Sequence, residues 1–218
     1  MQDTFLMIIE VLGTIAFAIS GIRLAAAKRF DWFGAYVVGL VTAIGGGTLR
    51  DVLLDIPVFW MQSSMYLAVT GISLLTVIIF KHFLVKGMRT LFTFDAIGLA
   101  LFVVVGIEKT LAIDYPMWVA VVMGITTGSF GGVIRDILLN EEPLFFRKDI
   151  YATACLAGGV AYWLVSLFSP NGYLPSAACA ATVIGLRVLA VTYNWSLPIL
   201  RVPEQDIPDD DKWSDNHH

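Results

Sequence analysis

Seven mainly apolar stretches, each roughly 20 residues long, constrain this chain more than any other feature, because an α-helix needs about that length to cross a bilayer. The composition agrees. Of the 218 residues, 57 % are hydrophobic and 15 % are charged, against about 25 % charged residues in an ordinary soluble domain. We therefore predict an all-α polytopic membrane protein. Its seven transmembrane helices are expected at 5–27, 33–54, 64–84, 92–111, 117–139, 150–168 and 175–193.

The composition also excludes several functions. A net charge of −4 leaves no basic face for nucleic acid. The two cysteines, Cys155 and Cys179, lack metal-ligand spacing, and His82 is the only histidine before the last two residues. No nucleophile and base stand together in the sequence, so we predict that the chain is not an enzyme and that it needs no cofactor and no metal.

The basic residues predict the orientation in the membrane. With seven spans, one side holds the first, third and fifth loops and the C-terminus, and the opposite side has Lys109 as its only clear basic residue. By the positive-inside rule, the N-terminus lies outside and the C-terminus lies in the cytoplasm. The basic residues of the cytoplasmic side are Lys28, Arg29, Lys81, Lys86, Arg89, Arg147, Lys148 and Arg201.

The sequence contains an internal repeat. Residues 45–54, GGGTLRDVLL, match residues 130–139, FGGVIRDILL, and the same gap-free offset of 85 aligns Tyr66 with Tyr151. Each copy holds three spans, an odd number, so the second copy is inverted in the membrane relative to the first. The predicted units are a first repeat (1–89), an inverted second repeat (90–172), a seventh helix (173–195) and a disordered acidic tail (196–218).

Three adjacent glycines, Gly45, Gly46 and Gly47, stand in the middle of the second span, and the fifth span repeats the last two as Gly131 and Gly132. A glycine costs about 1 kcal/mol relative to alanine inside a helix. Close helix packing needs only one small residue per turn. We therefore predict a break or kink at these glycines that lines a polar path. The alternative is that they serve close packing alone.

An Arg-Asp pair follows each glycine group by about one helical turn. The pairs are Arg50-Asp51 and Arg135-Asp136. Ionisable residues inside a span are costly and therefore point to function. The alternative is that both pairs extend to the membrane interface. Because the second repeat is inverted, we expect the two arginines at opposite ends of a central path.

Acidic residues at equivalent positions of the first and fourth spans are expected to neutralise these arginines. We predict that Glu10 pairs with Arg50 and that Asp95 pairs with Arg135, because the offset of 85 makes both the acids and the arginines equivalent. Three further charged residues of the spans are interpreted as interface side chains: Arg23, Glu108 and Arg187.

The glycine and Arg-Asp motifs, repeated in two three-helix units, resemble the prokaryotic members of the trimeric intracellular cation (TRIC) channel family over residues 5–193. The resemblance implies a homotrimer in the prokaryotic plasma membrane, with a potassium-permeable pathway in each subunit lined by kinked second and fifth helices. The residues expected to line this pathway, or to bind substrate in it, are Gly45, Gly46, Gly47, Thr48, Arg50, Asp51, Ser129, Gly131, Gly132, Arg135 and Asp136.

Related prokaryotic sequences are also described as glycine transporters, so two functions are open at this point. In a channel, a monovalent cation exchanges its water for backbone carbonyls and for hydroxyls such as those of Thr48 and Ser129. In a transporter, Arg50 or Arg135, together with a half-helix N-terminus, binds the carboxylate of glycine. Both hypotheses require the same central site between the second and fifth spans.

Overall fold

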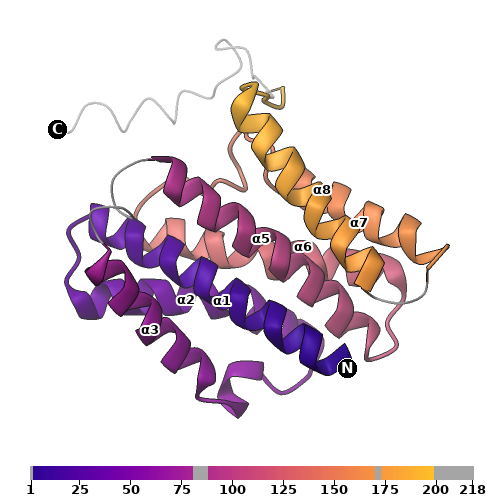
Figure 1. Cartoon of the computed structure of the whole chain (residues 1–218), viewed down its shortest axis with the longest axis horizontal. Coiled ribbons are helices and arrows are strands. Elements are labelled where there is room, and N and C mark those ends of the chain that lie inside the picture. Colours follow the sequence, from indigo (N-terminus) through magenta and orange to yellow (C-terminus); the bar gives the residue numbers. More distant parts are fainter. Residues whose placement is uncertain (1, 81–87, 170–172, 199–218) are drawn as a thin grey trace, which may run out of the picture.

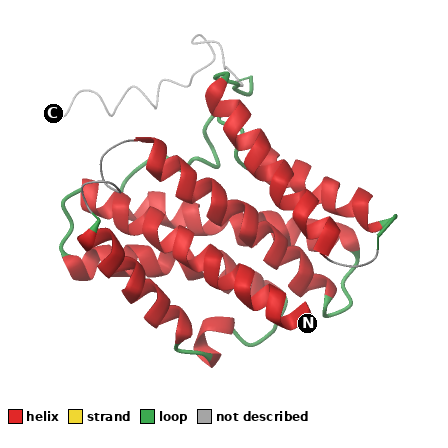
Figure 2. Ribbon diagram, in the orientation of Figure 1, coloured by secondary structure: helices red, strands yellow, loops and turns green. Residues whose placement is uncertain are grey.

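The computed structural model describes residues 2–80, 88–169 and 173–198. In these ranges the chain is helical, with seven α-helices, one 3-10 helix and a single isolated β-bridge between Asp149 and Ser196 (Figure 2). The elements are α1 (Gln2–Ala27), α2 (Trp32–Leu53), η1 (Phe59–Gln62), α3 (Met65–Ile79), α5 (Met88–Leu111), α6 (Met117–Leu138), α7 (Ala152–Ser166) and α8 (Tyr173–Thr192). The predicted fold class and the seven helices are confirmed.

The helices form a bundle with α1, α2, α5 and α6 at its centre. Figure 1 shows α1 and α5 running side by side in front of α2 and α6, with α3 on one flank and α7 and α8 on the other. α8 packs against α7 and α5, so the seventh helix leans on the second repeat. Large apolar side chains point outward from the flanking helices, where lipid would cover them, among them Ile72, Leu75, Ile79, Leu156 and Leu164.

Five of the described helices are long and apolar enough to cross a membrane: α1, α2, α5, α6 and α8. The other two, α3 and α7, have 15 residues each and are shorter than the spans predicted at 64–84 and 150–168. Fifteen residues cover about 22 Å of helix, less than the roughly 30 Å of a hydrocarbon core. Both short helices occupy the third position of their repeat and follow a structured loop.

The helix ends show that the two repeats share one backbone plan. Arg29 (φ 63°) and Asp114 (φ 62°) follow α1 and α5, and Asp55 (φ 52°) and Asn140 (φ 52°) follow α2 and α6. All four adopt the left-handed conformation that commonly ends a helix. Each pair is separated by the offset of 85 found in the sequence.

The glycines of the repeat lie where α2 and α6 cross. A Cβ on Gly46 would overlap the carbonyl oxygen of Thr127, and a Cβ on the equivalent Gly131 would overlap the carbonyl oxygen of Thr42. Thr42 and Thr127 are themselves related by the offset of 85. The crossing is therefore antiparallel and reciprocal, as an inverted repeat with its two-fold axis between α2 and α6 requires.

The predicted break of the second and fifth helices is absent, and a kink without a break stays a prediction. α2 and α6 each run as one uninterrupted α-helix through their glycines. The physical reason is the crossing, because the backbone of the partner helix fills the space that a side chain would need. Ring carbons of Phe59 lie against Gly47, and the hydroxyl of Tyr151 lies against Gly132. Close packing alone is therefore enough to require glycine at these positions.

Some predictions fall outside the described residues. These include the basic residues Lys81, Lys86 and Arg201 and most of the predicted acidic tail, residues 199–218. The repeat boundaries near 89 and 172 adjoin the undescribed segments 81–87 and 170–172, so the exact division into units stays a prediction.

Candidate functional site

The two Arg-Asp pairs lie deep inside the bundle. Arg50 and Arg135 are each 1 % exposed, and neither extends to an interface as the alternative interpretation had it. Each pair is the centre of a cluster of ionisable side chains. The first cluster comprises Glu10, Arg50, Asp51, Tyr66 and Lys109. The second cluster comprises Asp95, Arg135, Asp136, Tyr151 and Arg187.

In both clusters the aspartate fixes its neighbouring arginine and a loop amide. Arg50 donates from Nε and Nη2 to Asp51 Oδ1, at 2.8 and 2.6 Å, and Asp51 Oδ2 accepts the backbone N–H of Phe59 at 2.9 Å. Arg135 donates from Nε to Asp136 Oδ1 at 2.8 Å, and Asp136 Oδ2 accepts the backbone N–H of Leu144 at 3.2 Å. Phe59 and Leu144 are again 85 residues apart, so the loops before α3 and α7 are held by the same device.

The predicted pair of Asp95 with Arg135 is present. Asp95 Oδ1 accepts from Arg135 Nη1 at 2.6 Å, and the same nitrogen donates to Ser20 Oγ of α1 at 2.8 Å. Both charged side chains are 1 % exposed. Ser20 is not among the site residues predicted from the sequence. Its equivalent in the other repeat is Val105, so the repeat gave no signal for this contact.

The predicted pair of Glu10 with Arg50 is wrong. Glu10 forms its ion pair with Lys109 of α5, and Arg50 is bound by Asp51. Lys109 also lies over the ring of Phe59, with its Nζ 5.1 Å from the ring centroid. As a result, Arg50 Nη1 is buried and has no hydrogen-bond partner among the described residues.

Arg187 of α8 belongs to the second cluster and not to the interface. It is 3 % exposed, and its Nη2 lies 3.5 Å from Asp95 Oδ2. Its guanidinium carbon lies 4.9 Å from the ring centroid of Phe92 and 4.8 Å from that of Tyr151. Lys109 and Arg187 thus occupy parallel positions, since each places a basic group beside the acid contributed by the first helix of a repeat.

Each cluster contains two acidic and two basic residues and is neutral overall when all four are charged. Charges inside a membrane protein are tolerated when they are paired in this way or reach water. The first cluster comes after the crossing along α2, and the second comes after it along α6. Because the two helices are antiparallel, the clusters lie toward opposite ends of the bundle. A charged solute that moves through the bundle would meet one cluster, then the tight crossing, then the other cluster.

The predicted hydroxyl ligands each donate a hydrogen bond within their own helix. Thr48 Oγ1 donates to Ile44 O at 2.8 Å and accepts from Trp60 Nε1 at 2.9 Å. Ser129 Oγ donates to Ile125 O at 2.6 Å, and Ser129 is fully buried. These bonds leave the hydroxyl oxygens with acceptor capacity only.

One buried acid was misassigned from the sequence. Glu108, interpreted as an interface residue, is 7 % exposed, and its Oε1 accepts from Tyr162 Oη at 2.8 Å and from Ser176 Oγ at 2.7 Å. These partners come from α7 and α8. Glu108 therefore ties the seventh helix to the second repeat.

The loops on one side of the bundle are joined by an exposed ion pair. Lys28 Nζ, after α1, lies 2.5 Å from Glu141 Oε1, after α6. The backbone N–H of Leu197, after α8, donates to Lys148 O at 2.8 Å. The first loop, the fifth loop and the segment after α8 therefore share one side, as seven spans require. The hydrogen bond from Lys28 lowers the pKa of Glu141 below its ordinary value.

Replacing Lys28 with glutamine is expected to raise the pKa of Glu141 toward its ordinary value, about 4.3 for a free glutamate. A lowered pKa in the folded state stabilises the fold above the unfolded-state pKa, and this contribution is lost as pH falls through the folded-state pKa. The stability change is small because the pair is exposed. Carboxyl-carbon NMR titration measures the shift. An unchanged Glu141 midpoint in K28Q would contradict the assignment, and R147Q, whose guanidinium lies farther away at 3.7 Å, is the matched control.

Comparison with known proteins agrees with this architecture. The family described as "Glycine transporter" matches residues 7–82 and 92–166, two segments that begin 85 residues apart. The chain is 38 % identical over 200 residues to the UPF0126 inner membrane protein YadS of Escherichia coli, covering 90 % of this chain and 96 % of that protein. The chain therefore belongs to this family of polytopic membrane proteins.

Solved structures share its fold over nearly the whole length. One is the TRIC trimeric intracellular cation channel orthologue from Rhodobacter sphaeroides, with a TM-score of 0.83, 32 % identity and coverage of 88 % of this chain and 100 % of that chain. Another, from work on conductance through TRIC cation channels, has a TM-score of 0.80 and 31 % identity, covering 90 % and 97 %. The resemblance to prokaryotic TRIC channels is confirmed.

Proposed function

We propose that the chain conducts monovalent cations, potassium foremost, through a pathway in each subunit of a homotrimer. The observation that carries this proposal is the pair of buried, charge-balanced clusters on the two sides of the α2–α6 crossing. Support comes from the shared fold of proteins described as cation channels. Residues of α2 and α6 from Gly45 to Asp51 and from Ser129 to Asp136 line the proposed pathway.

The clusters provide oxygen ligands for a cation that loses water. A cation can use a carboxylate only if a basic side chain withdraws from it. Arg50 and Arg135 are each locked onto the neighbouring aspartate of their own helix. Lys109 and Arg187 are held by one acid each, and the Lys109 side chain is 25 % exposed. These two basic groups therefore set the electrostatic barrier to a cation.

Replacing Lys109 with glutamine is expected to increase potassium flux several-fold. The change removes one positive charge and leaves the carboxylate of Glu10 free to bind the cation. A unit charge about 4 Å away is worth about 4 kcal/mol at an effective dielectric constant of 20, so even a partly solvated site should show the effect. Potassium flux into proteoliposomes that hold the purified full chain measures it.

The matched control for this test is K28Q, which removes a lysine that lies outside both clusters. It is expected to conduct like the wild type. If K109Q conducted no better than K28Q while remaining folded, the role given to Lys109 would be wrong.

Glycine transport is the second candidate, and one observation favours it. Arg50 Nη1 is buried without a hydrogen-bond partner among the described residues, and it can donate to a substrate carboxylate. The family description points the same way. One preparation separates the two functions. Potassium current in the absence of glycine supports the channel, and saturable uptake of labelled glycine with no unitary conductance supports the transporter.

We propose that the protein lies in a bacterial inner membrane with its N-terminus outside and its C-terminus in the cytoplasm. The Escherichia coli relative is described as an inner membrane protein. The side that carries Lys28 and Arg147 is the more basic one, and α8 ends on it. A green fluorescent protein fused to the C-terminus is expected to fluoresce, and alkaline phosphatase at the same point to be inactive. An active alkaline phosphatase fusion with a dark fluorescent protein fusion would show that the C-terminus lies outside.

A further inference from the structure

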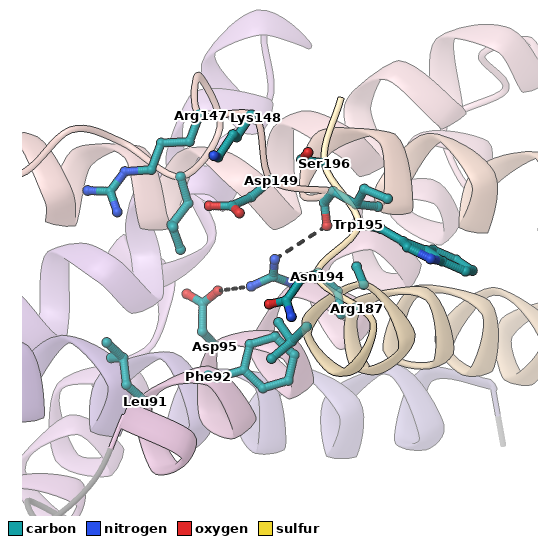
Figure 3. A pocket seen from close by; sticks show the side chains of 14 residues that line it. Leu91, Phe92, Asp95, Arg147, Lys148, Asp149, Arg187, Asn194, Trp195 and Ser196 are labelled. Carbon is teal, nitrogen blue, oxygen red and sulfur yellow. Dashed lines mark hydrogen bonds and ion pairs between the residues drawn. The ribbon is translucent and has the colours of Figure 1, made fainter. Parts of the chain in front are cut away.

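A cavity of about 400 Å³ lies beside the second cluster, bordered by the start of α5, the end of α8 and the loop between α6 and α7. Figure 3 shows Arg147 and Lys148 along one side of it, Phe92 and Asp95 along the other, and the guanidinium of Arg187 reaching toward Asp95 between them. Apolar side chains form much of the remaining wall, among them Leu91, Leu144, Ile150, Val191 and Trp195.

Arg187 is held in place but poorly hydrogen-bonded. Its contacts to Asp95 Oδ2 and to Ile150 O are long, at 3.5 and 3.3 Å, against about 2.9 Å for a good N–H···O bond. Its Nε is buried and has no partner among the described residues. The guanidinium also contacts the rings of Phe92 and Tyr151, which help to hold it in position. A buried, charged donor in a fixed position lacks a strong acceptor, and such a group is costly to leave unsatisfied.

Charged side chains also line the cavity. Arg147, Lys148 and Arg187 line it together with two acids, Asp95 and Asp149, and Arg147 also lies 3.7 Å from Glu141 and 3.8 Å from Glu142. Asp95 is already engaged through Oδ1 by Arg135 at 2.6 Å, outside the cavity lining. A negatively charged group that enters the cavity would therefore meet the unpaired Nε of Arg187 and the ammonium group of Lys148.

We propose that this cavity binds an organic anion that carries one carboxylate on an apolar body. The guanidinium fork of Arg187 matches the geometry of a carboxylate, with Lys148 as a second cation. The apolar wall, including Val191 and Trp195, contacts the rest of the molecule. A volume of about 400 Å³ lies within the usual range for sites that bind small molecules. The inference does not depend on cation conduction, because it concerns binding and not flux.

Benzoate is the probe, because it places a carboxylate on a compact apolar ring. Added to the purified full chain in detergent, it is expected to raise the midpoint of thermal unfolding and to change tryptophan fluorescence through Trp195, both in a saturable manner. Benzamide, which has the same shape without the charge, is expected to do neither. In R187K and K148Q the apparent Kd is expected to rise about tenfold or more, since a charged hydrogen bond is lost. K28Q, a basic residue of the same side that does not line the cavity, is expected to bind like the wild type.

Several outcomes would overturn the proposal. Equal binding of benzamide and benzoate would show that charge is not recognised, and equal benzoate affinity in R187K and the wild type would remove Arg187 from the site. A response to phosphatidylglycerol added to the micelles, with none to benzoate, would make this a lipid site. If R187K does not fold, V191W serves instead. It enlarges a half-exposed side chain of the cavity wall and is expected to abolish benzoate binding, and unchanged binding would refute the site.

Discussion

Valine in place of Gly46 is expected to prevent the protein from reaching its folded state. Any Cβ at this position overlaps the carbonyl oxygen of Thr127, which is backbone and belongs to a helix buried on several sides. Overpacking a core typically costs about 1–3 kcal/mol when side chains can adjust. Here α2 and α6 must separate along their whole crossing, so we expect a larger loss. Size-exclusion chromatography and thermal unfolding of the detergent-purified variant measure it.

The repeat supplies an internal replicate and the helices supply a control. G131V meets the carbonyl oxygen of Thr42 in the same way and is expected to fail equally. G71A, on α3, meets only a ring carbon of Tyr36 at 4.0 Å, and it should be neutral or stabilising, since alanine is favoured over glycine in a helix by about 1 kcal/mol. A folded, stable G46V protein would show that the crossing is looser than described.

The helix arrangement could be predicted because it follows from the internal repeat. An odd number of spans per copy dictates inversion, and inversion dictates reciprocal contacts such as those of Gly46 and Gly131. The pair of Asp95 with Arg135 followed from the same reasoning, since an acid and an arginine on neighbouring helices of a repeat must neutralise each other. These conclusions need only the offset of 85 and the energetic cost of unpaired charge in lipid.

Two basic residues that were misplaced by the predictions have no basic counterpart in the other repeat. Lys109 corresponds to Leu24 in the first copy, and Arg187 stands on α8, which has no counterpart. The repeat symmetry could not predict the position of either residue. Lys109 forms the ion pair with the acid that the symmetry would assign to Arg50. One sequence contains no information on which of two basic groups approaches a given carboxylate more closely.

The predicted break at the glycines is absent for a different reason. A run of glycines lowers the helix propensity of a segment whether the helix breaks or whether another backbone packs against it. The sequence of α2 alone cannot distinguish these outcomes, because the deciding atom is a carbonyl oxygen of α6. Glycine runs at equivalent positions of an inverted repeat therefore indicate a crossing on the two-fold axis at least as well as a kink.

Replacing Arg135 with glutamine is expected to be the most damaging single change in the second cluster. Asp95 and Asp136, both nearly fully buried, would lose their shared partner. Removing one member of a buried ion pair typically costs about 3–5 kcal/mol, because the remaining charge stays desolvated. Thermal unfolding of the purified variant measures the loss, and potassium flux in proteoliposomes reports whether the surviving protein still conducts.

A double-mutant cycle with Asp95 separates pairing from packing. D95N alone leaves Arg135 with Asp136, so it is expected to cost less than R135Q. D95N/R135Q should be more stable than R135Q because it removes one of the two buried acids that have lost Arg135. The coupling between the two positions should reach a few kcal/mol, the range measured for buried networks. K28Q/E141Q, the exposed pair of the loops, is the matched cycle and should show a much smaller coupling, because water screens the pair. If the two cycles gave equal coupling, the buried cluster would be no more than a set of independent contacts, and the electrostatic basis of the proposed pathway would fail with it.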